Sequence, residues 1–291
     1  MDAAMLVRIA IVISVMLIVI ALGLRCKLAD AAYLLERPSL LARSLVAMNV
    51  IMPLVAVWLV SSFDLKTPVK VGLVALAVSP LPPFLPGKRL KLTSHGYIYG
   101  IVVAAAVCSV VLVPLTASLL SAHFHTRHVA ALKVFIVVVI TVLAPLFIGI
   151  SIQRIRPTHA VGLAAALYQG GLGLLTLACI PVVIMEWSSI RSLLGDGTLI
   201  AAIVLSALGL VVGHLLGGPD PENRTVLALA TASRHPGVAL VAGISASAQD
   251  PRLVTTAVLL GFLVSMIVTV PYAAWRKRVH GNAYASTAGS V

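Results

Sequence analysis

The sequence predicts an all-α integral membrane protein with about nine transmembrane helices. Of the 291 residues, 60% are hydrophobic and only 10% are charged, whereas a soluble globular domain has about 25% charged residues. Nine mostly apolar runs approach the roughly 20 residues that a helix needs to cross a bilayer, and basic residues gather at the ends of these runs. This composition excludes a cytoplasmic enzyme, a disordered protein and a secreted scaffold.

The nine apolar runs define the predicted spans. In chain order they cover residues 5–24, 40–62, 68–86, 97–121, 130–152, 160–185, 193–215, 224–246 and 253–275. Trp58, Trp187 and Trp275 lie near predicted span ends, where amphipathic rings prefer the headgroup layer of a membrane. Two of the nine runs, the third and the eighth, are interrupted in ways that would break an ordinary helix.

The third span contains four prolines within seven residues, at positions 80, 82, 83 and 86. Each proline removes an amide donor and clashes with a preceding carbonyl, so no continuous helix is expected here. Unpaired backbone groups at membrane depth are tolerated only where they are buried in protein or line a watery cavity. We therefore predict an unwound crossing in this span. Proline kinks within a packed bundle are the alternative.

The eighth span is interrupted by Pro236-Gly237 and carries Arg234, the only arginine or lysine well inside a span. Every acidic residue lies at a span end or in a loop, so no carboxylate partner is predicted for Arg234 within the membrane. A lone arginine at the bilayer centre costs at least about 2.5–3.5 kcal/mol, and it should therefore face a cavity, backbone carbonyls or a ligand. The alternative is that the span is misplaced and that Arg234 reaches an interface.

The two interrupted spans occupy corresponding places in two halves of the chain. If the fifth span is a connector, spans one to four and six to nine form halves of opposite orientation. Paired interruptions of this kind are the best sequence indication of a secondary transporter's binding site. We predict an inverted repeat in which two broken helices cross.

Counts of lysine and arginine predict the orientation. One set of alternate loops holds twelve basic residues, among them Arg276, Lys277 and Arg278, and the other set holds seven. By the positive-inside rule the richer set is cytoplasmic, the N-terminus is outside and the C-terminus is inside. The net charge of +12 is therefore interpreted as a topology signal, and no nucleic-acid partner is expected.

No catalytic or metal-binding motif is found in a suitable context. The HxHxxH cluster at 123–128 lies in a predicted solvated loop without a cysteine or carboxylate nearby. The three cysteines lie far apart and have no ligand spacing. Serine-hydrolase, zinc-protease and nucleotide-binding fingerprints are absent from their required contexts. We expect neither an enzyme nor a resident metal or cofactor.

Several segments in a fixed order resemble the bile acid:sodium symporter family, including its bacterial members called sodium-dependent transporters. The resemblance covers most of the chain. The segments are Ala21-Leu22-Gly23-Leu24, a loop ending at Arg37-Pro38, Val50-Ile51-Met52-Pro53-Leu54, Ser79-Pro80-Leu81-Pro82-Pro83, and Arg234-His235-Pro236-Gly237-Val238-Ala239.

The resemblance implies one membrane transporter domain over residues 1–291 with a panel and a core. The panel would comprise about 1–24 and 130–185, the core about 40–121 and 193–275, and a cytoplasmic tail would follow over 276–291. Two broken helices would cross near the midplane, and an organic anion would bind beside them. Many members have ten spans, and by the resemblance this chain is expected to lack the first, as some members do.

The positions that bind sodium in the family carry other residues here. Met48 stands where the family has a glutamine, with Asn49 next to it, and Ala230 and Arg234 replace a glutamate and a second glutamine. The family's serine- and threonine-rich run is mostly alanine and valine over 102–107. Sodium is therefore expected to matter little or not at all.

These observations favour a secondary transporter that moves a small organic anion by alternating access, resident in a lipid bilayer, by resemblance the inner membrane of a bacterium. A membrane-embedded binding or sensor protein on the same fold, a conventional sodium-coupled organic-anion symporter and a passive channel are the alternatives. The predicted substrate-binding residues are Asn49, Ser79, Pro82, Pro83, Thr231, Ser233, Arg234, His235 and Gly237.

Overall fold

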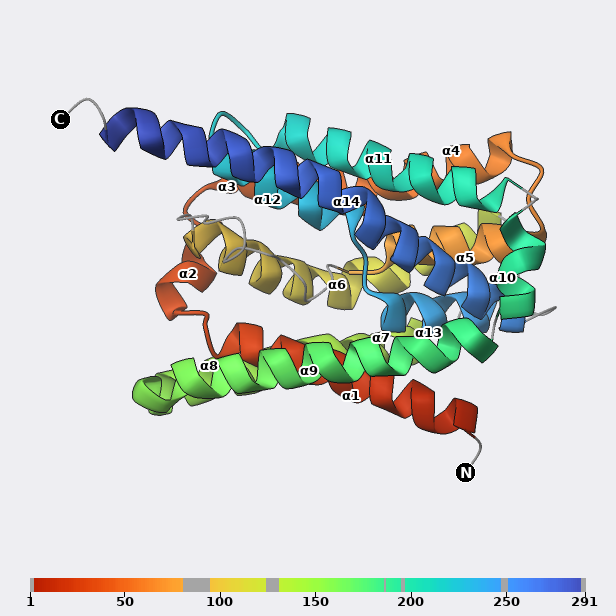
Figure 1. The fold of residues 1–291 in the computed structure, drawn as a ribbon, viewed down its shortest axis with the longest axis horizontal. Coiled ribbons are helices and arrows are strands. Elements are labelled where there is room, and N and C mark those ends of the chain that lie inside the picture. The colour runs from red at the N-terminus through yellow and green to blue at the C-terminus, as the bar shows by residue number, and fades with distance from the viewer. Residues whose placement is uncertain are drawn as a thin grey trace.

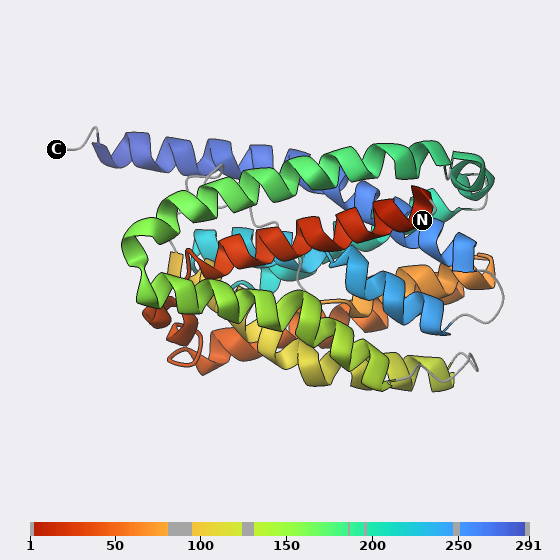
Figure 2. The same cartoon turned by 90° about the horizontal axis from the view of Figure 1, so that it is seen from below.

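The computed structural model describes residues 3–80, 95–123, 131–185, 187–194, 197–246 and 251–288. Every regular element in these ranges is a helix, so the predicted all-α class is confirmed. The long helices lie roughly along one axis, and α1 begins at the end of the molecule opposite to the one where α14 ends (Figures 1 and 2). An odd number of membrane crossings would give this placement.

The described elements are α-helices, with two short π-helices, η1 and η2, among them. They are α1 (Ala3–Gly23), α2 (Leu28–Ala32), α3 (Pro38–Val46), η1 (Ala47–Ile51), α4 (Met52–Ser62), α5 (Thr67–Val78), α6 (His95–His123), α7 (Ala131–Val138), η2 (Val139–Leu143), α8 (Ala144–Ile155), α9 (Pro157–Met185), α10 (Trp187–Leu194), α11 (Thr198–Leu216), α12 (Pro221–Ala232), α13 (Pro236–Ala246) and α14 (Pro251–Ala288).

Seven helical segments of the described residues are long and apolar enough to cross a membrane. They are Pro38–Ser62, Gly96–Thr116, Leu132–Ile155, Pro157–Pro181, Thr198–Leu216, Pro221–Ile244 and Pro251–Val279. Two shorter apolar helices, Ile9–Gly23 and Thr67–Val78, fall on the first and third predicted runs. The membrane-spanning class is thereby supported, while the count of nine stays a prediction.

Each π-helix directly precedes a proline at the second position of the next helix, Pro53 after η1 and Pro145 after η2. A proline inside a helix clashes with the carbonyl four residues earlier and donates no hydrogen bond. The wider turn of a π-helix makes room for the ring. The two prolines therefore explain why both helices continue as helices with a local defect.

The first helix packs along α8 and α9. Gly23 and Gly149 make this contact close, because a methyl group at either position would overlap the backbone of the other helix. These helices lie together on one side of the molecule (Figure 1). The composition of the panel and its separation from the core as a unit stay predictions.

A second close contact fixes α12 against α11. Gly209 and Gly213 of α11 and Gly217 at its C-cap lie four residues apart, and each faces the backbone of α12. Larger side chains there would separate the two helices. The place where α12 ends is therefore set by a continuous line of backbone contact.

The predicted interruption of the eighth span is confirmed. Helix α12 ends at Ala232, residues 233–235 are not helical, and α13 begins at Pro236. In the third span α5 ends at Val78, Ser79 is extended, and Pro80 is not helical. The predicted crossing residues Pro82 and Pro83 lie outside the described residues. Helix α14 continues beyond the predicted span end at 275, so the predicted tail is helical up to Ala288.

Candidate functional site at the helix crossing

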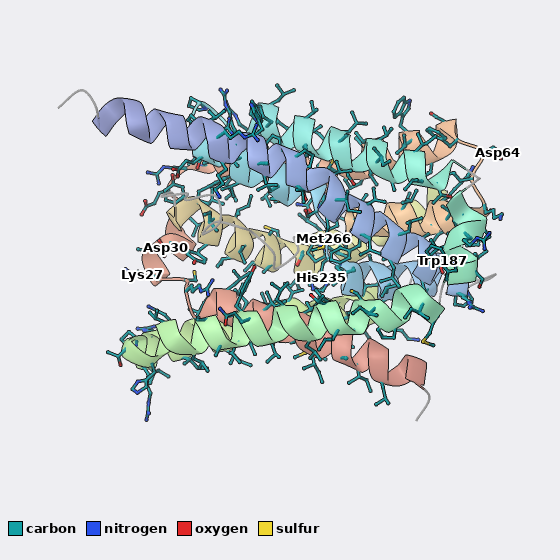
Figure 3. All side chains as sticks on the ribbon, viewed as in Figure 1. Lys27, Asp30, Asp64, Trp187, His235 and Met266 are labelled. Atoms are coloured by element: carbon teal, nitrogen blue, oxygen red, sulfur yellow. The ribbon has the colours of Figure 1, made fainter. Side chains whose placement is uncertain are left out.

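The two interrupted spans meet in the structure. The backbone N–H of His235 donates to the carbonyl oxygen of Pro80 at 2.9 Å. Figure 3 places His235 near the middle of the long axis, beside α13. The segments that the sequence predicts to cross are thus joined at their breaks by a direct backbone hydrogen bond.

Proline leaves the carbonyls at the end of α5 without helical donors. A helical carbonyl accepts from the N–H four residues later, or three residues later in a tighter turn. For the carbonyl of Ser79 both of those positions, Pro82 and Pro83, are prolines and have no N–H. This carbonyl must find its donor elsewhere in the fold.

The π-helix η1 creates a second free carbonyl. In this element the N–H of Met52 donates to the carbonyl of Ala47, five residues earlier. The next bond of the same kind would run from Pro53 to the carbonyl of Met48, and proline has no N–H to give. The carbonyl of Met48 is therefore also left without a helical donor, at a residue only 2% exposed.

Arg234 supplies both missing donors. Its Nη2 donates to the carbonyl of Met48 at 2.8 Å, and its Nη1 donates to the carbonyl of Ser79 at 3.3 Å. The side chain is only 4% exposed, and within the described parts of the chain no acidic group pairs with it. The sequence predicted that Arg234 would face a cavity, backbone carbonyls or a ligand, and in the structure it faces backbone carbonyls and a small cavity.

Two buried donors at the crossing remain without acceptors among the described residues: Nε of Arg234 and Nε2 of His235. The imidazole of His235 is 1% exposed, and its Nδ1 accepts from the N–H of Val238 at 3.2 Å. His235 thereby caps the N-terminus of α13. Because Nδ1 is the acceptor, the neutral ring carries its proton on Nε2.

A cavity of about 10 Å³ opens beside Arg234, which is space for a single water molecule. Its polar lining consists of Arg234 and the hydroxyls of Thr231, Ser206 and Ser265. Each hydroxyl donates to a carbonyl of its own helix, so its oxygen can still accept. The cavity can hold one water between the guanidinium and these hydroxyls, but it is too small for an organic anion.

Of the other predicted site residues, some lie at the crossing and its cavity and others do not contact them. Thr231 lines the cavity, and Gly237 gives room to the His235 ring, whose Cε1 would lie 3.2 Å from a methyl group at that glycine. Ser233 is half-buried and its N–H donates to the carbonyl of Leu229. The amide of Asn49 donates to the carbonyl of Leu45 in its own helix at 3.2 Å. Asn49 thus has no hydrogen bond to the part of the crossing that the structure describes.

Sequence reasoning named Ser79 and Met48 for their positions, but their carbonyl oxygens are what contact Arg234. The hydroxyl of Ser79 donates to Leu76 of its own helix. The carbonyl of Pro80 and the hydroxyls of Ser206 and Ser265 were missed. The signal for the carbonyls was present, because prolines stand three, four or five residues after each of them.

Elsewhere in the described chain a second arginine, Arg276 of α14, is also buried, and it donates to the hydroxyl of Thr225 and the carbonyl of Pro221. No cluster of three or more His, Cys, Asp or Glu side chains within the described ranges could hold a metal ion. In the turn after α1, burial and the nearby charge of Asp30 raise the pKa of the Cys26 thiol to about 12. This thiol therefore stays protonated and unreactive at neutral pH.

Comparison with known families gives one match. Residues 11–214 match the family described as the sodium bile acid symporter family. No curated protein matches the chain. The family match covers well over half of the sequence and ends before α12, so Arg234 and His235 lie beyond it.

Proposed function

Since this chain belongs to the sodium bile acid symporter family, a family of membrane transporters, we propose that it moves a small organic anion by alternating access around the crossing. One observation carries the proposal. Arg234 holds a buried positive charge where the broken spans meet, without a carboxylate partner among the described residues. An arginine at membrane depth marks a substrate or ion pathway by default.

The chemistry at the crossing favours an anion. The two unpartnered groups there, Nε of Arg234 and Nε2 of His235, are both donors. Helix α13 begins at the next residue, Pro236, and the N-terminus of a helix carries partial positive charge. Half-helix N-termini of this kind face anionic groups of substrates in secondary transporters. A carboxylate or a similar oxyanion would satisfy the charge and both donors.

The same geometry argues against a sodium ion. Backbone carbonyls that a cation would use, those of Met48 and Ser79, already accept from the guanidinium of Arg234. A sodium ion about 4 Å from a fixed guanidinium would be disfavoured by about 4 kcal/mol at an effective dielectric of about 20, roughly a thousandfold in affinity. We therefore propose transport that depends weakly on sodium or not at all.

The small size of the cavity supports alternating access. An organic anion does not fit the space of about 10 Å³ beside Arg234, so the helices around the crossing must separate before substrate reaches it. The close packing of α11 on α12 supports movement of these two helices as one body. We propose that a path for the substrate opens between the α11–α12 pair and the helices around α1, α8 and α9.

Orientation and location are part of the proposal. The N-terminus is proposed to lie outside and the C-terminus in the cytoplasm of a bacterial cell, because twelve basic residues against seven favour that side. Reporter fusions after Arg278 and at the N-terminus test this. A C-terminal reporter that is active only outside the cytoplasm would overturn both the orientation and the odd number of spans.

Binding and flux test the proposed activity. Purified protein is screened by thermal shift against cholate, benzoate and lactate, with sodium or potassium as the cation, and the same anions are followed into proteoliposomes. We expect saturable uptake that survives replacement of sodium by potassium, and weak binding in Arg234→Gln compared with Arg234→Lys. Binding without uptake would indicate a sensor, and uptake without saturation a channel. Steep sodium dependence with an unaffected Arg234→Gln variant would restore the conventional symporter.

A further inference from the structure

We infer that the protein is an electrogenic uniporter of a monovalent organic anion, in which Arg234 acts as a permanent counter-charge. This inference rests on the proposed transport function and adds its energetics. Transporters that bind a free cation release it in each cycle and draw energy from its gradient. A guanidinium attached to the chain cannot be released, so it can neutralise a substrate without contributing a gradient.

The crossing holds Arg234 as it would hold a bound cation. Three carbonyl oxygens, those of Met48, Ser79 and Pro80, accept hydrogen bonds from the Arg234–His235 segment, and the first two have no helical donor. Two of them contact the guanidinium itself. These residues are almost fully buried, and the acceptors belong to elements remote in sequence. The guanidinium thereby fills the position that carbonyls of broken spans offer to a cation.

The remaining described groups at the crossing carry no formal charge. His235 is neutral while its Nδ1 accepts from Val238, and the cavity adds only hydroxyls and apolar side chains to Arg234. The empty crossing therefore has a charge of +1. With one bound monoanion it has a charge of zero. A monoanion is the substrate charge that a single guanidinium neutralises.

This charge count assigns the voltage-sensitive step. When the loaded crossing changes its exposure from one side of the membrane to the other, no net charge crosses the membrane. When the empty crossing returns, one positive charge crosses. A complete cycle thus moves one negative charge in the direction of the substrate. Exchange of substrate for substrate uses the loaded form in both directions and moves none.

The expected magnitude is fixed by the charge. One elementary charge gains about 2.3 kcal/mol per 100 mV, and a tenfold ratio of concentrations corresponds to about 1.4 kcal/mol. A monoanion at equilibrium across the membrane therefore accumulates tenfold for about every 60 mV of potential that is positive on the accumulating side. Sodium on either side leaves this ratio unchanged.

The test compares net uptake with exchange in the same proteoliposomes. Potentials are set with valinomycin and potassium gradients, without sodium and at equal pH on both sides. The probe is radiolabelled cholate, benzoate or lactate, whichever is taken up in the flux assay above. We expect net uptake to follow the potential with tenfold accumulation per about 60 mV, and exchange into preloaded vesicles to be insensitive to it.

Other patterns would overturn the inference. Net uptake that ignores the potential, that needs a sodium or proton gradient, or that occurs only as exchange would each contradict an electrogenic uniporter. Absence of flux for every probe would instead remove the proposed transport function itself, so the two failures are distinguishable.

A pair of variants tests the role of Arg234. In Arg234→Gln the empty crossing is neutral and the loaded crossing carries one negative charge. The rate of exchange should therefore depend on the membrane potential, and the return of the empty crossing should not. Arg234→Lys keeps the charge and should keep the pattern of the parent protein. Potential-independent exchange in an active Arg234→Gln protein would contradict the assignment. If that variant does not fold, the parent's own comparison of uptake with exchange still decides.

Discussion

The break after α5 and the break between α12 and α13 hold equivalent places in the two predicted halves, but their chemistry is opposite. The first break offers acceptors, the carbonyl oxygens of Ser79 and Pro80. The second break offers donors, the guanidinium of Arg234 and the N–H of His235. Two identical breaks would leave unpaired groups of the same kind. The crossing is stable because one half supplies what prolines remove from the other.

The largest effect is expected from Arg234→Met, which deletes the donors of the second break. The carbonyls of Met48 and Ser79 would both lose their partner, and each buried unpaired group costs about 1–3 kcal/mol. We expect unfolding in detergent to show a loss of about 2 kcal/mol or more. Arg224→Met is the control, because that arginine also donates to a carbonyl, of Gly218, but at a half-buried site near the start of α12. Equal losses would show that the crossing is not special.

His235 caps α13 with Nδ1 and offers Nε2 as a donor, and replacement by asparagine or by glutamine separates these two roles. Asparagine is a good N-cap and can replace Nδ1, but it does not reach the position of Nε2. Glutamine reaches the position of Nε2 but loses the cap. We expect His235→Asn to weaken anion binding about tenfold or more with little change in stability, since a hydrogen bond to a charged group contributes about 1.5–3 kcal/mol. His235→Gln should lose about 1 kcal/mol of stability and keep more of its affinity. The reverse order in binding and thermal melts would assign His235 to structure alone.

The acceptor break can be altered by returning its donors. Pro82→Ala together with Pro83→Ala places two N–H groups three and four residues after Ser79, where they compete with Arg234 for its carbonyl. A backbone hydrogen bond has a net value of about 0.5–1.5 kcal/mol, so transport should fall by up to about tenfold while expression changes less. Unchanged transport by this double variant would show that the proline run is incidental.

The smallest effect is expected from the π-helix, and it comes with a matched control. Pro53→Ala would return an N–H within reach of the carbonyl of Met48 and compete with Arg234 for it. Pro145→Ala makes the same change after η2, where the carbonyl five residues earlier belongs to Ile140, a residue with 52% exposure and no side-chain donor among the described residues. We expect anion affinity to fall by about two- to fivefold in Pro53→Ala and to stay the same in Pro145→Ala. Similar affinities of the two variants would refute a role for the η1 carbonyl.

Local sequence predicted the helices and the places where they break, because apolar length, proline and glycine act within a few residues. It also indicated that Arg234 needs carbonyls, a cavity or a ligand. It did not indicate which carbonyls, since Met48 lies 186 residues away in the chain and only the fold brings it near. Asn49 was chosen for its polar side chain, yet that amide bonds to its own helix, as polar side chains of membrane helices often do.

The helical boundaries near the surface were predicted least well. The seventh span was expected to begin at 193, but α10 ends at Leu194 and α11 begins at Thr198 after Gly197, whose φ of 78° forms the turn. Helix α10 is a short separate helix, most of which the prediction left in the connection between the sixth and seventh spans. Where a chain reaches the membrane surface, turns and amphipathic segments depend on packing, and apolar length alone does not locate them.

The hydrogen bonds of Arg234 also imply an order of assembly. Synthesis proceeds from the N-terminus, so the chain containing Met48 and Ser79 is made well before the ribosome reaches Arg234. The costly guanidinium thus enters the bilayer when its acceptors are already present. If the order were reversed, an unpaired charge would have to wait in lipid for its partners. The positions of donor and acceptors along the chain therefore favour insertion without a charged intermediate.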